Sequence, residues 1–396
     1  MNSSSEIRSA YTRDYFLTDC GGYQEYIKFK GRRLADERLV ALASVASLRH
    51  YGSVLDLGCG RGELAYYFAQ MQRPVTAIDY SADAVELAKQ TFGQDETFRR
   101  YVDLRCEDVT ESKLAGEYEL AVAADVIEHL SPAELDQMYH NVAQHLSPTG
   151  LFLVHTFPNV WHYRYHYPRE RALAARRGEE LTEQPRTPFE LQMHINEQNP
   201  RQLRRQLAKF FPYVLLWFAT TGDMAGSLVR PYRLREMAGA RDLFAVAAKR
   251  PIDLDRLRSR MRSQPHSPVL LRSVRLKARC PCLVVTRGQE FNLEVEVDNR
   301  SPLSLNAYPP NPVNLSYRWL DSRGDTDPRD PLRTPLLPCI SPGSRRSLLA
   351  TVAAPSRSGD YTLRLTLVQE WVRWLDEPQI GLFCSLPVAV TDGIQP

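Results

Sequence analysis

The sequence has no run of eighteen apolar residues, so it predicts no membrane-spanning helix. Its first residues, MNSSSEIRSA, contain no hydrophobic stretch, and we therefore expect no secretory signal. The seven cysteines are scattered and odd in number, which is typical of reduced thiols in a cytosol. Cys280 and Cys282 form a CxC pair with no second pair at zinc-site spacing, so no metal site is expected there. These absences predict a cytoplasmic protein.

Net charge is also small, at +3, and the sequence contains no internal repeat or low-complexity tract. A charge this low gives no field that would attract nucleic acid, and no RNA-binding module is visible. What is present is a chain of 396 residues with 43% hydrophobic and 24% charged residues. That length suits two globular domains better than one core.

The part of the chain from residue 1 to about 250 alternates strand-like and helix-like segments. Strands are predicted at residues 54–58, 74–80, 119–126 and 151–157, the last after the turn SPTG, and helices at 63–70, 82–92 and 132–146. Strands that alternate with helices indicate an α/β fold with a parallel sheet covered on both faces.

The pattern changes after residue 265. Apolar and polar residues alternate with a period of two over residues 291–298, 315–319 and 361–367, and turns rich in Pro, Gly, Asn and Ser separate these runs. This predicts an all-β, immunoglobulin-like antiparallel sandwich over residues 269–396.

A basic linker is expected between the two domains, at residues 251–268. Ten Lys or Arg residues lie between Lys249 and Arg279, and Leu254, Leu257 and Met261 fall on one helical face. We interpret the segment as a solvated linker helix. The alternative is contact of residues 249–279 with an anionic lipid surface or polymer, which would place the protein at the inner face of the membrane.

The stretch VLDLGCGRGE, residues 54–63, reads as a strand that enters a glycine-rich turn. Its GxGxG spacing fits neither the dinucleotide fingerprint nor the P-loop. Asp56, just before the first glycine, is poorly placed for a phosphate and well placed for an ammonium group. The expected ligand therefore has a cation near this loop and no phosphate.

The next two predicted strands complete the ligand. Asp79, at the end of PVTAIDY, can accept hydrogen bonds from two ribose hydroxyls, and Tyr80 can lie against adenine. Asp108, followed by Val109 in CEDV, can accept from an exocyclic amine. Adenosine combined with an amino acid, without phosphate, is S-adenosylmethionine (SAM).

With these motifs in order, residues 35–160 resemble the class I SAM-dependent methyltransferases. The resemblance implies a Rossmann-like, seven-stranded sheet with one antiparallel hairpin, whose last strands are expected near residues 213–219 and 242–249. It also implies that Gly58, Cys59 and Gly60 hold the methionine part of SAM, and AADVIEHL, residues 123–130, matches the motif after the fourth strand. Asp125 in that motif completes the expected cofactor contacts.

The expected catalytic residues are Asp125, Glu128, His129 and His194. We expect them at strand ends around the acceptor hydroxyl, with an imidazole taking its proton. The same four residues resemble the metal ligands of small-RNA 3′-end 2′-O-methyltransferases, where Mg or Mn would bind. DVIEH-like runs also occur without a metal, so both interpretations stay open. His155, in an apolar strand, is expected to be a core histidine.

An aromatic insertion at residues 158–195 is expected on the acceptor side, and a tyrosine-rich N-terminal lid at residues 1–45. The lid resembles that of methyltransferases found with bacterial polysaccharide-assembly enzymes. The C-terminal half resembles an accessory domain of glycan-modifying enzymes, with Trp371 and Trp374 as candidates to stack on sugars and Trp319 in the core.

Together these resemblances imply SAM-dependent O-methylation of a sugar hydroxyl on a bacterial glycan or glycolipid, in partnership with polysaccharide-assembly enzymes. Three alternatives remain: an RNA 2′-O-methyltransferase with a divalent metal, a small-molecule O-methyltransferase, and a glycan-binding scaffold without catalysis.

Overall fold

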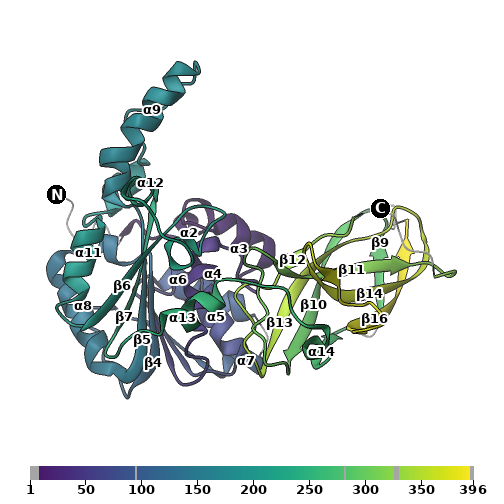
Figure 1. Cartoon of the computed structure of the whole chain (residues 1–396). Helices are drawn as coiled ribbons and strands as arrows, with labels where there is room; N and C mark the ends of the chain where they lie inside the picture. The colour runs from purple at the N-terminus through teal and green to yellow at the C-terminus, as the bar shows by residue number, and fades with distance from the viewer. Residues whose placement is uncertain (1–8, 94–95, 281, 325–329, 393–396) are drawn as a thin grey trace. The chain divides into compact units, whose positions relative to one another are not determined.

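The protein was analysed as a computed structural model, which describes residues 9–93, 96–280, 282–324 and 330–392. The chain divides into two compact units, residues 1–258 and 259–396. The division falls inside the segment that the sequence predicts to be a linker. Figure 1 shows the α/β unit and the all-β unit in chain order. No helix of the described part is long and apolar enough to span a membrane.

The first unit is built on one seven-stranded sheet. Its strands are β1 Val54–Leu57, β2 Val75–Asp79, β3 Val102–Cys106, β4 Tyr118–Ala124, β5 Leu146–Thr156, β6 Tyr213–Ala219 and β7 Asp242–Ala248. They lie in the order β3-β2-β1-β4-β5-β7-β6. Strands β1 to β5 pair in parallel, whereas β7 runs antiparallel to both of its neighbours. The predicted sheet, with its single antiparallel hairpin at the end, is confirmed.

Helices cover both faces of this sheet (Figure 1). The main ones are α4 Glu37–Ala46, α5 Glu63–Gln70, α6 Ala82–Phe92, α8 Pro132–His145 and α11 Pro200–Leu207. Local sequence explains where they begin: Ser131 and Glu134 form a reciprocal capping box on α8, and Ser81 caps α6. The three helices predicted from periodicity are α5, α6 and α8.

Further helices, most of them short, lie before, between or after these main elements. They are α2 Arg13–Thr18, α3 Tyr23–Phe29, α7 Glu96–Arg99, η1 Ile127–His129, η2 His162–His166, α9 Tyr167–Arg176, α10 Pro188–Met193, η3 Gly226–Leu228, α12 Leu234–Gly239 and α13 Leu254–Arg260. The segments α2 and α3 form the N-terminal lid, and η2 to α10 form the insertion after β5.

The fifth strand differs from its prediction. It begins at Leu146, so the residues SPTG belong to the strand rather than to a turn before it. The register between β4 and β5 shifts there, since Tyr118 pairs with Leu146 whereas Leu120 pairs with Leu151. A local irregularity absorbs the extra residues, which period-two reasoning does not anticipate.

The second unit contains two sheets around one core. After α14 Pro268–Leu271, its strands are β8 Val274–Ala278, β9 Leu283–Thr286, β10 Glu290–Asn299, β11 Val313–Leu320, β12 Thr334–Pro335, β13 Ser344–Ala353, β14 Gly359–Gln369, β15 Arg373–Trp374 and β16 Phe383–Thr391. One sheet has the order β13-β10-β8, and the other has β12-β11-β14-β16-β9 with β15 on β14. The predicted sandwich is confirmed, except that β9 and β16 pair in parallel.

Alternation decides which side chains fill the sandwich. Val295, Val297, Leu363 and Leu365 point into one core cluster, and Trp319 joins them at 3% exposure, as expected. Trp371 is 85% exposed. The ring of Trp374, by contrast, faces two arginines of its own domain.

The basic segment is not a simple solvated linker. Residues 254–260 form the helix α13, and Leu257 and Met261 are buried, whereas Leu254 is exposed. Arg260 is also buried, and its guanidinium contacts Ser304. Leu257 and Met261 lie one helical turn apart, which explains why both are buried. The many basic residues of the segment had favoured a solvated helix instead. Contact of this segment with an anionic surface stays a prediction.

Candidate active site

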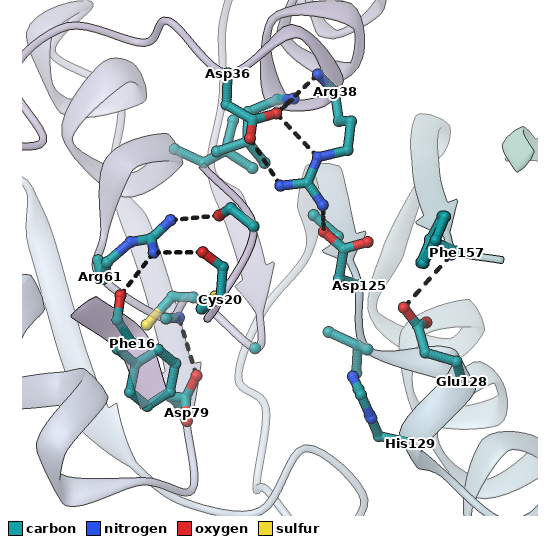
Figure 2. A pocket seen from close by; sticks show the side chains of 18 of the residues that line it. Phe16, Cys20, Asp36, Arg38, Arg61, Asp79, Asp125, Glu128, His129 and Phe157 are labelled. Atoms are coloured by element: carbon teal, nitrogen blue, oxygen red, sulfur yellow. Dashed lines mark hydrogen bonds and ion pairs between the residues drawn. The ribbon is translucent and has the colours of Figure 1, made fainter. Parts of the chain in front are cut away.

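A cavity of about 790 Å³ opens in the first unit, and the carboxyl ends of β1, β2 and β4 contribute to its wall. All twelve residues predicted to form the site line it: Asp56, Gly58, Cys59, Gly60, Asp79, Tyr80, Asp108, Val109, Asp125, Glu128, His129 and His194. Figure 2 shows Asp79 and Arg61 on one side and Asp125, Glu128 and His129 on the other. The predicted cofactor and acceptor residues therefore share one space.

The glycines after β1 are required mainly by the turn itself. Gly58, Gly60 and Gly62 have φ values of 69°, 50° and 80°, a region that disfavours other residues. A Cβ on Gly58 would lie 2.4 Å from Cγ2 of Val126, and one on Gly62 would lie 2.8 Å from Cβ of Ala88. Only Gly60 is roomy, with its nearest neighbour 3.9 Å away, so it leaves its backbone open to a ligand.

Asp56 presents an unsatisfied carboxylate oxygen to this cavity. The side chain is buried, and its Oδ2 atom has no hydrogen-bond partner among the described residues. Burial, with the nearby carboxylates of Asp79 and Glu63, raises the pKa of Asp56 to about 7. A cationic ligand would satisfy this oxygen and favour its charged form, as expected for the ammonium group of SAM.

Asp79 is held in place by the backbone. Its Oδ2 accepts from the Gly60 N–H and its Oδ1 from the Ser81 N–H, both at 2.9 Å. Each oxygen keeps a further lone pair, so both can still accept from ribose hydroxyls. Burial raises the pKa of Asp79 to about 6, against the effect of the two backbone hydrogen bonds. The same carboxylate thus braces the glycine loop and faces the cofactor space.

The adenine side is defined by the turn after β3. Asp108 accepts through Oδ1 from the N–H and hydroxyl of Thr110, at 2.8 and 2.7 Å, which fixes its orientation. Val109 is 6% exposed and adds an apolar surface. Glu107 instead accepts from the Ser112 hydroxyl and does not line the cavity, which supports the choice of Asp108.

Sequence reasoning missed Arg38, one of three arginines that line the cavity. Its Nη2 and Nε bond to Asp36 at 2.7 and 3.0 Å, and its Nη1 bonds to Asp125 at 2.7 Å. Three of its five N–H groups are thus used, and the others can meet a carboxylate such as that of the methionine moiety. No motif marks this residue, because it precedes β1 and reaches the site only through the fold.

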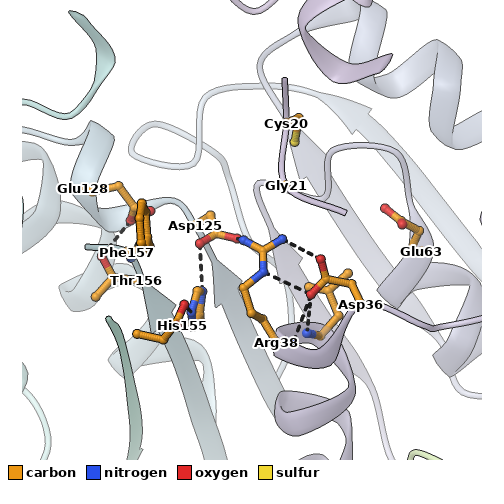
Figure 3. A network of polar contacts seen from close by, with 12 residues as sticks. Cys20, Gly21, Asp36, Arg38, Glu63, Asp125, Glu128, His155, Thr156 and Phe157 are labelled. Atoms are coloured by element: carbon orange, nitrogen blue, oxygen red, sulfur yellow. Dashed lines mark hydrogen bonds and ion pairs between the residues drawn. The ribbon is translucent and has the colours of Figure 1, made fainter. Parts of the chain in front are cut away.

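Asp125 belongs to a partly buried network of ion pairs (Figure 3). Its carboxylate pairs with Arg38 and lies 2.8 Å from Nδ1 of His155, whose Nε2 lies 3.1 Å from Asp242. Burial would raise the pKa of Asp125, but Arg38 and His155 outweigh it and hold the pKa well below its usual range. Asp242 and Asp125 raise the pKa of His155 to about 10 against the effect of burial.

These contacts bear on two sequence interpretations. His155 is fully buried, as expected of a core histidine, and its two ring nitrogens face the carboxylates of Asp125 and Asp242. Asp125 is engaged by Arg38 and His155, so it does not join the group of possible metal ligands. It also adopts a left-handed φ of 55°, a strained conformation that the surrounding pairs maintain.

Glu128, His129 and His194 form the acceptor-side cluster. Their ligand atoms all lie within 4.8 Å of one another, and the two imidazole rings are 4.9 Å apart. The Nδ1 of His129 lies 3.1 Å from the Met193 carbonyl oxygen, so this nitrogen carries the proton and Nε2 keeps a lone pair. Burial, with His194 nearby, lowers the pKa of His129 to about 3. His129 is thus a neutral base at physiological pH.

The pKa values of the two residues beside His129 are both raised. Glu128 accepts from the Thr156 hydroxyl at 2.9 Å, and burial together with Asp125 raises its pKa to about 7. Glu197 and Glu128 raise the pKa of His194 although burial opposes them. Imidazole suits transition-metal ions whereas Mg prefers oxygen ligands, so one carboxylate oxygen and two imidazole nitrogens fit a divalent ion such as Mn better than Mg. Such an ion would lower the pKa of a bound hydroxyl.

The insertion at residues 158–195 contributes to the cavity, but not through the tryptophan and tyrosine rings of residues 161–167. Within its described residues, Trp161, Tyr163, Tyr165 and Tyr167 lie outside the cavity lining. The Tyr163 ring packs under Arg186 at 3.9 Å, and the Tyr167 hydroxyl donates to the Thr182 carbonyl. These rings stabilise the insertion itself. Glu190 of α10 and the following His194 and Ile195 line the cavity instead.

Comparison with known proteins agrees with this geometry. Residues 54–150 match the family model described as a methyltransferase domain. The first unit therefore contains a class I SAM-dependent methyltransferase domain, and SAM is the cofactor of that class. The match covers β1 to β4 and the start of β5, and it includes every predicted cofactor residue.

Among curated proteins, the chain is similar to a ubiquinone biosynthesis O-methyltransferase of Rickettsia typhi, at 30% identity over 103 residues, covering 26% of this chain and 40% of the relative. It is also similar to a malonyl-[acyl-carrier protein] O-methyltransferase of Bacillus cereus, at 26% identity, covering 33% and 45%. The chain thus spans less than half of these relatives. The solved DhpI–SAH complex aligns with a TM-score of 0.38 at 16% identity, over 62% of this chain and 96% of that one.

Proposed function

We propose that the protein transfers the methyl group of SAM to a hydroxyl group, and that the acceptor is a sugar hydroxyl of a glycan or glycolipid. The observation that carries the proposal is the single cavity in which Asp56 and Asp79 stand opposite Glu128, His129 and His194. Methyl transfer is an in-line displacement, so it needs cofactor and acceptor in one enclosed space.

A hydroxyl acceptor suits the base that the cavity contains. A hydroxyl must lose its proton as the oxygen attacks the methyl group, and a neutral imidazole can accept that proton. The Nε2 of His129 has the required lone pair because Nδ1 is committed to the Met193 carbonyl. Glu128 and His194 then stand beside the developing imidazolium. The two curated relatives described above are O-methyltransferases, which supports the same choice.

The acceptor end favours a neutral polyol. Over the whole cavity lining, cofactor side included, carboxylate residues outnumber arginines thirteen to three, which disfavours an anionic acceptor such as RNA. Carboxylates are hydrogen-bond acceptors, which match the many donors of a sugar. Phe157 and Ile195 add the apolar surface on which a sugar ring packs. Exposed Trp371 in the fused sandwich is a second candidate contact for a longer glycan.

A phenolic small molecule is the second candidate. The ubiquinone O-methyltransferase relatives favour it, and so does the wall of rings in which Phe157 lies 6.3 Å from His194. A phenol would use the same base and the same cofactor. The two acceptors differ in how many hydroxyl groups the carboxylates could engage.

An acceptor screen with methyl-labelled SAM tests the proposal. Neutral oligosaccharides, phenols and RNA oligomers would be offered to the full chain at equal concentration, with the Asp79→Ala variant as a negative control. Labelling of an oligosaccharide is expected. Labelling of phenols alone would move the acceptor to the second candidate, and labelling of RNA alone would contradict the charge argument. If calorimetry detected no SAM binding, the protein would instead be a scaffold without catalytic activity.

A further inference from the structure

The N-terminal lid is fastened to the cofactor loop by a buried arginine. Arg61, within the glycine motif, is 4% exposed and donates to the carbonyl oxygens of Phe16 and Gly21 at 2.8 and 2.7 Å. The Ser81 hydroxyl donates to the Tyr11 carbonyl oxygen at 2.8 Å. These bonds hold the start of the lid against the loops that follow β1 and β2.

This fastening brings Tyr11 into the cavity. Its ring centre lies 5.3 Å from that of Tyr80 and 5.5 Å from that of His129, in edge-on geometry with both. The Tyr11 hydroxyl oxygen is buried and has no hydrogen-bond partner among the described residues. Tyr11 therefore bridges a residue of the cofactor side and a residue of the acceptor side, with one polar atom left unsatisfied.

The chemistry of SAM decides what lies at that junction. Its sulfonium joins the methionine chain, expected at Asp56 and the glycine loop, to the ribose, expected at Asp79. The methyl group must point from this sulfur to the acceptor near His129, because displacement is in-line. The sulfonium and its methyl group therefore occupy the space between Tyr80 and His129, which Tyr11 borders.

We propose that Tyr11 faces the sulfonium centre and contributes selective affinity for SAM over its product S-adenosylhomocysteine (SAH). The inference rests on the proposed function, since it assumes SAM in this cavity. The electron-rich ring attracts a cation placed near it, and the hydroxyl oxygen accepts weak hydrogen bonds from the polarised methyl group. SAH is neutral at sulfur and has no methyl group there, so it gains neither contact. Burial raises the pKa of Tyr11, which keeps the phenol protonated.

Calorimetric titration of the full chain with SAM and with SAH tests this role without an identified acceptor. The variants are Tyr11→Phe, which keeps the ring, and Tyr11→Leu, which removes both ring and hydroxyl. We expect SAM affinity to fall about threefold in the first and about tenfold in the second. SAH affinity should stay within about twofold. Tyr23→Leu is the matched control, because Tyr23 lies in the same lid but does not line the cavity.

Each outcome has a separate meaning. A fall in the SAM-to-SAH affinity ratio in the order Tyr, Phe, Leu supports the proposal. Equal losses for both ligands would overturn it and leave Tyr11 as a packing residue of the lid. Unchanged affinity for both ligands in Tyr11→Leu would also overturn it, because the sulfonium would then lie elsewhere. Absence of SAM binding by the wild-type chain would contradict the proposed function itself and not the placement of Tyr11 alone.

Discussion

The Nδ1 atom of His155 lies 2.8 Å from the Oδ1 atom of Asp125, and the imidazole has no exposed surface. On its other side the same ring meets Asp242 at 3.1 Å. A buried charge with two partners is costly to disturb, because removal of one member leaves the others desolvated and unpaired. This pair therefore ties the end of β4, where the acceptor motif begins, to β5 and β7.

His155→Leu should destabilise the first unit by about 3–5 kcal/mol, because it leaves Asp125 and Asp242 without the imidazolium between them. Scanning calorimetry would measure this, since SAH raises the transition that belongs to the first unit and so identifies it. His140→Leu is the control, because His140 is exposed. A transition as stable as that of the wild type would show that His155 is not charged in the folded state.

Asp56→Asn should have opposite effects on stability and on binding. Because the pKa of Asp56 is raised to about 7 from an ordinary 3.8, the ligand-free fold loses stability as pH rises from 3.8, and the loss is complete above about 7. The variant should therefore melt higher than the wild type at pH 8, and the difference should vanish only near pH 4 or below. SAM binding should weaken by about 1.5–3 kcal/mol, because the ammonium loses a charged partner.

Thermal melting and calorimetry at the two pH values would measure both effects. Asp103→Asn is a matched control, because Asp103 is exposed on β3 of the same sheet. Equal melting of variant and wild type at pH 8 would mean that Asp56 already has a partner when no ligand is bound.

Asp79→Ala should lower SAM affinity by about 1.5–3 kcal/mol for each charged hydrogen bond lost to ribose. The change also removes the acceptor of the Gly60 and Ser81 N–H groups, so the glycine loop should exchange amide hydrogen faster. Glu107→Gln is the comparison, because Glu107 accepts from Ser112 outside the cavity. Unchanged SAM affinity in Asp79→Ala would show that the ribose lies elsewhere.

His129→Ala should lower turnover by roughly 10²-fold or more, as expected for loss of a general base, while SAM binding persists. The binding residues lie on other strands, so calorimetry separates the two effects. Wild-type turnover in this variant would show that His129 is not the general base. Methyl transfer would then depend only on the positioning of SAM and acceptor.

A chelator distinguishes the roles of the Glu128, His129 and His194 cluster. Loss of activity in EDTA, restored by Mn or Mg, is expected if the cluster holds an ion that lowers the hydroxyl pKa. Full activity in EDTA would leave His129 as the base without a metal. The His194→Ala variant refines the test, since weaker restoration by added Mn identifies His194 as a ligand.

A fragment of residues 1–258 should fold and bind SAH as the full chain does, because the division between the units lies at residue 258. A shorter fragment ending at residue 250 lacks Leu257, which is buried, and tests whether α13 is needed. Aggregation of both fragments, with a soluble full chain, would show that the two units depend on one core.

Most of the candidate cofactor residues that line the cavity were predictable from sequence because they are local to strand ends. Asp56, Gly58, Asp79 and Asp108 each follow or end a strand whose apolar pattern is clear, and parallel strands place their carboxyl ends together. The period-two pattern likewise indicated the sandwich. A turn that needs positive φ selects glycine directly, so the sequence carries that information in residue type alone.

Residues that reach the site from a distance were not predictable. Arg38 precedes β1, and although Asp36 is a local partner, Asp125 reaches it from the end of β4 only through the fold. His155 was assigned correctly to the core, but its two carboxylate partners, which lie on β7 and after β4, were not predictable. Sequence alone determined the class of fold and the residues local to strand ends. Tertiary packing decided which charges became partners, since burial and distance, which residue type does not encode, govern electrostatic pairing.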